Sequence, residues 1–317
     1  MALAERGTGN AREALPFACE PSLAHWDRCI MKSIVLAASF CLLLTPSAAR
    51  AELADALAAT SVEYYPSAKN GDRPGETQIN VLRTSAGVPI PLSDDTKLIA
   101  GASYELIDVR PSASDAFQLH APKVTLGVSQ AFSKHWGLIA LGDAGFASDF
   151  SEAMSSEDVL LSLTGIATYS FSDALQLGAG AVYDRRTGKL LPLPAVLLDL
   201  RLSGRVRIHG FAPVWLNADF RATDWLDVGI RSTFEGNRFH VGERVFGMKD
   251  IELAYSNLTV GPKVTFNFGA WLHLDVYAAG AVYRRYELFQ NDDSVARYEL
   301  SPVIGYGARF WVAPSAW

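Results

Sequence analysis

His273 and Asp275 stand two positions apart near the end of the chain, and Tyr277 follows at the same spacing. Side chains two residues apart in a strand point to the same face of the sheet. A carboxylate placed beside an imidazole can orient it as a general base. The same pair can also form a structural hydrogen bond in a polar cavity. We favour the structural interpretation, because the opposite face of this segment carries no serine–histidine pair.

A second group of residues with possible chemistry is a set of charged side chains on neighbouring segments that share the same face. The set comprises Arg201, Arg205, Arg207, Asp219, Arg221, Asp227 and Arg231. Charges that line a pore can act as an electrostatic constriction that selects solutes. Because both signs interleave here, we favour an ion-pair network that fills and stiffens the interior. The candidate site is therefore Arg201, Arg207, Asp219, Arg221, Asp227, Arg231, His273 and Asp275.

Other kinds of site lack support in the sequence. The three cysteines, Cys19, Cys29 and Cys41, precede the predicted mature chain, which excludes a cysteine nucleophile, a cysteine metal site and disulfides. No spacing of histidines and carboxylates is typical of a structural metal site. The glycine-rich stretches are not phosphate loops, because no helix follows them. We predict no catalytic residues, no metal and no cofactor.

The elements that must position these residues are strands, and the segment from Trp271 to Trp311 displays them best. Alternate residues are apolar or small from Leu272 to Val282, and the residues between them include His273 and Asp275. After a polar break at 287–294, the alternation returns from Ala296 to Val312. Period-2 alternation predicts a hairpin with one apolar face and one polar face. Charged side chains are unsuited to a dry core, so we expect the apolar face to contact lipid and the polar face to line a lumen.

The same alternation recurs through the rest of the chain. The predicted strands cover 62–65, 78–88, 97–109, 124–132, 138–146, 161–171, 175–183, 190–202, 206–220, 226–234 and 251–268. Short connections are predicted at 133–135, 172–173, 203–204, 223–224 and 269–270, and long loops at 148–157, 236–250 and 285–294. Outer-membrane barrels have short periplasmic turns and longer outer loops. We predict an all-β antiparallel transmembrane barrel of 12–14 strands, with 206–220 either one long strand or two short ones.

The N-terminal region reads as a targeting segment. Residues 31–51 combine a basic start, an apolar run and the small-residue motif Ala49-Arg50-Ala51, which predicts a cleaved signal peptide. Residues 1–30 are interpreted as an over-called start or an extended n-region. The barrel domain is predicted at 52–317. Removing residues 1–51 changes the formal charge from −6 to −7, because that segment holds five basic and four acidic residues. An acidic chain without a basic run argues against a nucleic-acid partner.

The signal peptide, the cysteine-free alternating body and the aromatic-rich final strand resemble bacterial outer-membrane β-barrel proteins. The segment Leu191-Pro192-Leu193-Pro194, followed by Leu200-Arg201-Leu202 and Phe211-Ala212-Pro213, is similar to a family of predicted barrels of unknown function. The resemblance implies a location in the bacterial outer membrane, contact with its lipid and lipopolysaccharide, and insertion by the barrel assembly machinery.

Three functions follow from this sequence analysis. The first is a non-enzymatic envelope barrel, either a narrow channel for small solutes or a closed structural barrel. The second is a barrel enzyme that acts on lipid or lipopolysaccharide, for which His273 with Asp275, or His209, supplies the histidine. The third is a soluble barrel that binds a small apolar ligand and turns its apolar face inward.

Overall fold

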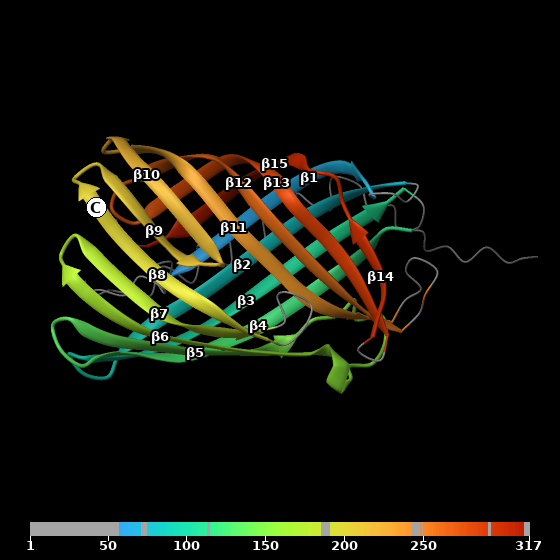
Figure 1. Ribbon diagram of the computed structural model, residues 1–317, viewed down its shortest axis with the longest axis horizontal. Coiled ribbons are helices and arrows are strands. Elements are labelled where there is room, and N and C mark those ends of the chain that lie inside the picture. Colours follow the sequence, from blue (N-terminus) through green and yellow to red (C-terminus); the bar gives the residue numbers. More distant parts are fainter. Residues whose placement is uncertain are drawn as a thin grey trace, which may run out of the picture.

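Figure 1 shows the computed structural model of the chain, which describes residues 57–70, 75–112, 115–184, 191–242, 248, 250–290 and 293–313. The strands are β1 (Ala58–Lys69), β2 (Glu76–Pro91), β3 (Thr96–Pro111), β4 (Phe117–Ala131), β5 (Trp136–Phe146), β6 (Val159–Ser172), β7 (Leu175–Asp184), β8 (Leu191–Ser203), β9 (Val206–Ala212), β10 (Trp215–Thr223), β11 (Leu226–Val241), β12 (Ile251–Phe268), β13 (Leu272–Gln290), β14 (Asp293–Glu299) and β15 (Val303–Val312). A short 3-10 helix, η2 (Ser156–Asp158), precedes β6. No helix among these residues is long and apolar enough to cross a membrane. The predicted signal peptide lies outside the described residues.

The strands close into an antiparallel barrel. Consecutive strands pair from β1 through β13, and β15 pairs with both β13 and β1. β14 pairs with the other half of β13, so β14 and β15 together occupy one position in the wall. The ring therefore has fourteen strands. The all-β antiparallel barrel and the strand number of 12–14 are confirmed.

The segment predicted as one long strand or two is two strands. β9 ends at Ala212 and β10 begins at Trp215, with Pro213 and Val214 between them. The two strands pair with each other from Trp215↔Phe211 to Phe220↔Val206. Because proline has no N–H to donate to a ladder, Pro213 is suited to a connection between strands. This hairpin makes the strand number even.

The two ends of the barrel differ, and we name them by their connections. The turn end carries the short connections after β2, β4, β6, β8, β10 and β12, and the register Ala58↔Val312 places the start of β1 and the end of β15 there too. In Figure 1 it lies at the left. The loop end, at the right, carries η2 and the ends of the longest strands. The short connections lie at one end, as predicted. The predicted long loops at 236–250 and 285–294 are wrong in extent, because β11 continues to Val241 and β13 to Gln290. The connection between β9 and β10, on the side of the loop end, is only two residues long.

Apolar side chains face outward over the turn-end part of the wall. Examples with more than half of their surface exposed come from strands all round the barrel: Leu126 on β4, Leu163 on β6, Val196 on β8, Ile230 on β11 and Ile304 on β15. Exposed aromatic residues gather beside the short turns: Phe132, Trp136, Phe171, Trp225, Phe268 and Trp271. Aromatic girdles mark the edges of the apolar band in membrane barrels. These faces agree with the predicted lipid-facing surface.

Toward the loop end, the polarity of the two faces of the longest strands reverses. The inward face becomes apolar and the outward face becomes polar, which the sequence analysis did not predict. On β12, Val260 and Phe268 face outward, whereas Lys263 is buried in the lumen. Nearer the loop end, Leu253 is fully buried in an apolar core, and Glu252, on the opposite face of β12, forms an ion pair with Arg238 of β11. An apolar inner face and a polar outer face are expected where a wall stands in water. The reversal indicates that these strands continue past the lipid belt.

The barrel also narrows at the loop end, because a short segment replaces several strands in the wall. Ser148 forms a β-bridge with His120 of β4 on one side and with His240 of β11 on the other. The His120 amide donates to the Ser148 carbonyl at 2.8 Å, and the Asp149 amide donates to the His240 carbonyl at 3.1 Å. We call residues 147–149 the bridge. At the turn end, strands β5 to β10 lie between β4 and β11. At the loop end, the bridge connects β4 directly to β11, so the ring there has a smaller circumference.

An apolar core fills the narrow part, and we call it the plug. It contains buried side chains from β1 to β4, β11 to β14, the bridge and β6. Its fully buried members include Ile79, Val81, Ile107, Leu119, Phe239, Leu253 and Leu288. Dense packing of large apolar side chains leaves few voids wider than a water molecule. The plug therefore fills the interior of the barrel at the loop end with apolar side chains, within the part of the chain that the structure describes.

The final hairpin differs from its prediction in two ways. β13 continues to Gln290, so the predicted polar break at 287–294 is largely strand. β14 and β15 are separated at 300–302, and their faces are out of phase: Tyr298 is buried in the plug, whereas Ile304 and Tyr306 face outward. A constant period across this break predicted one face for both strands. The chain shifts phase at Pro302, which carries no N–H for a ladder.

Candidate functional site

A polar cavity lies in the lumen on the turn-end side of the plug. Its volume is about 340 Å³, and it is partly open to solvent. Its lining includes Ser61, Arg83, Glu105, Asp143, Arg231 and Glu235, which come from β1, β2, β3, β5 and β11. Residues of both charge signs therefore meet across the barrel from strands that are far apart in the sequence.

Glu63 of β1 is the centre of this charged cluster, and only 3% of its surface is exposed. Its Oε2 accepts hydrogen bonds from the Tyr65 hydroxyl at 2.8 Å and from Arg83 Nη1 at 3.1 Å. Its Oε1 accepts one from the Tyr277 hydroxyl at 2.6 Å and lies 3.6 Å from Arg231 Nη2. Burying a carboxylate is costly unless it is paired and hydrogen-bonded. Glu63 meets this requirement with four partners.

Arg83 links Glu63 to two further carboxylates. Its Nε donates to Glu105 Oε1 at 2.8 Å, and its Nη2 lies 2.7 Å from Glu235 Oε2. Arg231 lies 4.0 Å from the other oxygen of Glu235, and its guanidinium stacks 4.4 Å above the Tyr277 ring. The planar fork of arginine is suited to several carboxylates at once. We call Glu63, Arg83, Glu105, Arg231 and Glu235 the lumen network.

Two glycines on β15 make room for the tyrosines that hold Glu63. A side chain at Gly305 would meet the ring of Tyr65, and one at Gly307 would meet the ring of Tyr277. Glycine is the residue that permits such close approach in a strand. The two rings lie across β15, so the small residues of this strand position the hydroxyls in the lumen.

Arg231 is the member of the predicted set that belongs to the lumen network. Asp219 belongs to a second cluster, where its Oδ2 lies 3.0 Å from His209 Nε2 and its Oδ1 lies 2.9 Å from Lys263 Nζ. Lys263 and Asp219 are buried, so the lysine balances the charge of the carboxylate within the lumen. Sequence reasoning singled out His209 and Asp219 but did not pair them with each other.

The remaining charged residues of the predicted set lie closer to the turn end. Arg207 is buried and donates through Nε to Asp199 Oδ1 at 2.7 Å. Arg201 is partly exposed, and its Nη2 lies 3.6 Å from the same carboxylate. Arg221 and Asp227 are register partners on β10 and β11. Asp227 also accepts a hydrogen bond from the Asn267 side chain at 3.0 Å.

His273 and Asp275 face the lumen, but each has other partners. His273 Nδ1 lies 2.7 Å from Asn267 Oδ1, its Nε2 lies 3.2 Å from the Ala313 carbonyl, and its ring stacks on Trp311. Asp275 accepts a hydrogen bond from Thr265 at 2.8 Å. Both imidazole nitrogens are therefore engaged by groups other than Asp275. This arrangement agrees with a structural role and offers no oriented general base.

Sequence reasoning missed four members of the lumen network: Glu63, Arg83, Glu105 and Glu235. Each lies on a strand whose alternation is weak or breaks off near that residue. The period-2 spacing could have identified two of them as inward-facing. Arg83 and Glu235 each stand at an even number of positions from other inward residues of the same strand. Which residues then meet across the lumen depends on the closure of the ring.

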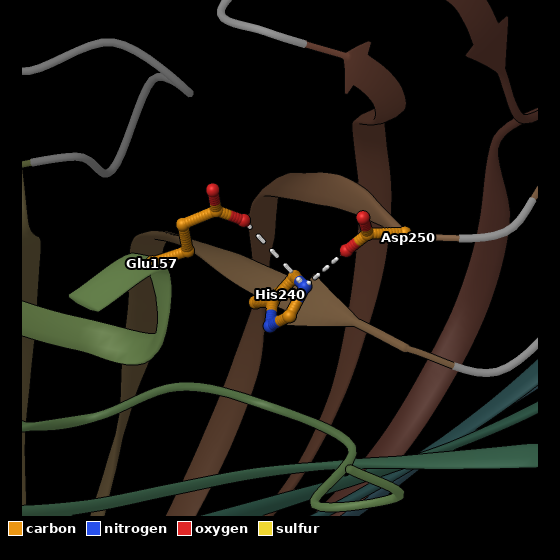
Figure 2. A group of neighbouring side chains, drawn as sticks. All are labelled: Glu157, His240 and Asp250. Atoms are coloured by element: carbon orange, nitrogen blue, oxygen red, sulfur yellow. Dashed lines mark hydrogen bonds and ion pairs between the residues drawn. The ribbon is translucent and has the colours of Figure 1, made fainter. Parts of the chain in front are cut away.

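A different cluster lies at the loop end, beside the bridge. Figure 2 shows Glu157 and Asp250 pointing toward the same nitrogen of His240. His240 Nε2 lies 2.9 Å from Asp250 Oδ1 and 3.6 Å from Glu157 Oε2. One ligand atom from each of the three residues lies within 4.8 Å of the other two. Imidazole and carboxylate groups are common ligands of zinc and related ions. Sequence reasoning missed this cluster, because Glu157 lies more than 80 residues before His240 and a loop separates His240 from Asp250.

Asp158 orients the histidine from the other side. Its Oδ1 lies 3.0 Å from His240 Nδ1, and its Oδ2 accepts a hydrogen bond from the Ser155 amide at the start of η2. Burial alone favours the neutral acid, but hydrogen bonds from Ser148, the Ser155 amide and His240 hold the pKa of Asp158 below its usual range. An ionised Asp158 accepts a hydrogen bond from Nδ1–H, so the other ring nitrogen, Nε2, is the one that faces Glu157 and Asp250.

Comparison with known families shows where the chain belongs. Residues 56–297 match the model of a family described as a domain of unknown function, DUF6268. The chain belongs to this family. The match covers the barrel from the residue before the described region to β14. No curated protein matches the chain.

Three solved structures are among those to which the chain is similar. The translocator domain of the autotransporter NalP from Neisseria meningitidis is 11% identical, with 92% of this chain and 96% of that chain covered and a TM-score of 0.39. The COG4313 outer membrane channel from Pseudomonas putida F1 is 13% identical, with coverage of 85% and 99% and a TM-score of 0.40. A deletion mutant of TodX, a monoaromatic hydrocarbon channel, is 10% identical, with coverage of 81% and 89% and a TM-score of 0.43.

Proposed function

We propose that this member of the family is a bacterial outer-membrane barrel that is closed to flow along its axis, and that it acts as a structural component of the envelope rather than as an enzyme. The plug is the observation that carries the proposal. Its fully buried side chains come from strands on different sides of the ring, and we expect their packing to leave no continuous polar path for water and ions through the loop end.

Two further observations support this proposal. The outward apolar surface with its aromatic row is suited to outer-membrane lipid and lipopolysaccharide. We expect the barrel assembly machinery to insert a barrel of this kind. The lumen network joins opposite walls through ion pairs that are mostly shielded from solvent. A connected network of this kind stiffens the barrel and narrows the passage beneath the plug.

Conductance in a planar lipid bilayer tests the proposal. Purified barrel whose insertion is shown by a heat-dependent gel shift should give no steady current. A double variant, Leu119→Ser with Leu253→Ser, introduces polar groups into the plug and should raise the conductance above that baseline. Steady openings of the wild-type barrel, at the same amount of inserted protein, contradict a closed barrel.

A narrow channel for small solutes is the second candidate, and the cavity favours it. The cavity has a volume of about 340 Å³, is partly open to solvent and carries charges of both signs. If the wild-type barrel conducts, Arg231→Gln should shift its ion selectivity toward cations, because the variant removes a positive charge from the lumen. An unchanged selectivity would place the conducting path elsewhere.

A further inference from the structure

We propose that Glu157, His240 and Asp250 bind one divalent transition-metal ion at the loop end of the barrel. The three residues come from different elements: Glu157 lies in η2, His240 is the second-last residue of β11, and Asp250 directly precedes β12. Figure 2 shows both carboxylates directed at one imidazole nitrogen. The site is separate from the lumen network and from the predicted set of residues.

The distances fit a single small ion. With bonds of about 2.1 Å, tetrahedral ligand atoms stand roughly 3.4 Å apart. His240 Nε2 lies 2.9 Å from the Asp250 carboxylate and 3.6 Å from that of Glu157, values that bracket this spacing. The two carboxylate oxygens lie within 4.8 Å of each other, and the side chains of Glu157 and Asp250 are 63% and 68% exposed, so they are free to move closer around an ion. Their exposure also leaves an entry path and space for a water ligand.

The surroundings of His240 are those of a metal-bound histidine. A ligating imidazole generally donates its second N–H to a carboxylate, which fixes the ring and its tautomer. Asp158 is 2% exposed and fills that position at 3.0 Å from Nδ1. His240 itself is 8% exposed, so its ring is held in place by packing. The ligand histidine is therefore oriented before any ion arrives.

Charge balance points to a cation. Three carboxylates surround one imidazole, and those of Glu157 and Asp250 face the same nitrogen. Like charges at this separation repel each other, and a divalent ion between them removes the repulsion. One nitrogen with two carboxylates is a donor set for zinc and its neighbours, whereas calcium is bound by oxygen ligands.

Because the site lies beside the bridge, a bound ion would affect the stability of the narrowed end of the barrel. The backbone of His240 pairs with the bridge, since its amide donates to the Ala147 carbonyl at 2.9 Å and its carbonyl accepts from the Asp149 amide. An ion bound by Glu157, His240 and Asp250 would connect η2, in the segment that follows the bridge, to β11 and to the start of β12. The bridge itself pairs with β11, so the ion adds a second link at the same place. Binding should therefore stabilise the narrowed end of the barrel.

Zinc titration of the barrel in detergent is the direct test. The protein is expressed as the full chain, purified from outer membranes without a histidine tag, and stripped of metal with a chelator. Titration calorimetry should show one Zn²⁺ bound per barrel, and zinc should raise the midpoint temperature of the heat-dependent gel shift. Calcium at the same concentration should do neither.

Variants of the exposed ligands keep the test independent of folding. Glu157→Gln and Asp250→Asn change solvent-exposed side chains, and each should weaken zinc binding by on the order of 100-fold while the gel shift without zinc stays as in the wild type. Asp158→Asn should weaken binding by about 10- to 100-fold, as expected for a carboxylate that orients a ligand. His135→Gln and Asp224→Asn, in exposed turns at the other end, serve as controls and should bind zinc like the wild type.

Two results overturn the proposal. One is the absence of saturable binding at one ion per barrel. The other is equal zinc binding by the wild type, Glu157→Gln and Asp250→Asn, which would assign the bound zinc to other groups on the barrel or to residual lipopolysaccharide. In either case the three carboxylates serve only to hold the His240 ring.

Discussion

The Tyr277 hydroxyl donates a 2.6 Å hydrogen bond to Glu63, a residue 214 positions earlier in the chain. The two residues lie on β13 and β1, and β15 stands between these strands in the wall. The tyrosine reaches across β15 because Gly307 has no side chain beneath its ring. The hydrogen bond therefore depends on closure of the barrel and on a glycine that contributes no polar group.

Removal of Glu63 should destabilise the barrel strongly. Glu63→Ala leaves Arg83 and Arg231 without a central carboxylate, and breaking a buried ion pair from one side costs about 3–5 kcal/mol. Urea unfolding in lipid vesicles, followed by tryptophan fluorescence, measures the loss. The matched control is Glu299→Ala on β14, whose exposed side chain should contribute within about 0.5 kcal/mol. Equal losses for the two variants would show that the lumen network does not hold the walls together.

Gly307→Ala should displace Tyr277 and so weaken the same hydrogen bond. A hydrogen bond to a charged group contributes about 1.5–3 kcal/mol, and a loss in that range is expected in the free energy of unfolding. Combining Gly307→Ala with Tyr277→Ala removes the clash, so the glycine substitution should then have little further effect. Gly204→Ala, in a turn where an added Cβ meets no atom within 4 Å, is the control. Additive effects in the double variant would contradict the contact.

The sequence predicted the barrel well where strands lie in the lipid belt. Along β12, for example, Val260 and Phe268 alternate with Thr259 and Lys263, and one period identifies both faces. The predicted assignment of an apolar outward face and a polar inward face failed where β12 continues beyond the lipid belt. The period of two persists there, but the apolar residues point inward into the plug. Periodicity reports that two faces differ and does not report which of them meets the solvent.

The two charged sites were predictable to different degrees. Asp219 and Arg231 lie on strongly alternating strands, so their inward direction followed from the sequence. Their partners did not. Glu63 of β1 reaches Arg231 of β11 only after the ring closes. Lys263 of β12 reaches Asp219 of β10 across the intervening strand β11. The cluster around His240 depends on the bridge, an irregular segment that pairs with two distant strands. No periodic signal marks such a segment.

A charge on the lipid-facing surface should separate a membrane barrel from a soluble one. Leu126 is 62% exposed on β4, six residues before the turn that follows Ala131. Leu126→Arg should cost about 2–4 kcal/mol of unfolding free energy in vesicles, as arginine does near the middle of a bilayer. Leu92→Arg, at an exposed turn position, should cost at most about 1 kcal/mol, the value near an interface. If both substitutions are tolerated equally, the apolar surface does not face lipid.

The plug should respond to loss of volume as a protein core does. Leu253 is fully buried among side chains of the plug, so Leu253→Ala leaves a cavity and should cost about 2–5 kcal/mol. Leu163→Ala removes the same atoms from an outward position that is 61% exposed. Detergent or lipid chains fill the space at that surface, so its loss should be clearly smaller. Urea unfolding of both variants in the same vesicles compares them. A loss for Leu253→Ala no larger than that for Leu163→Ala would mean that the loop end is loosely packed, and the argument for a closed axis would fail with it.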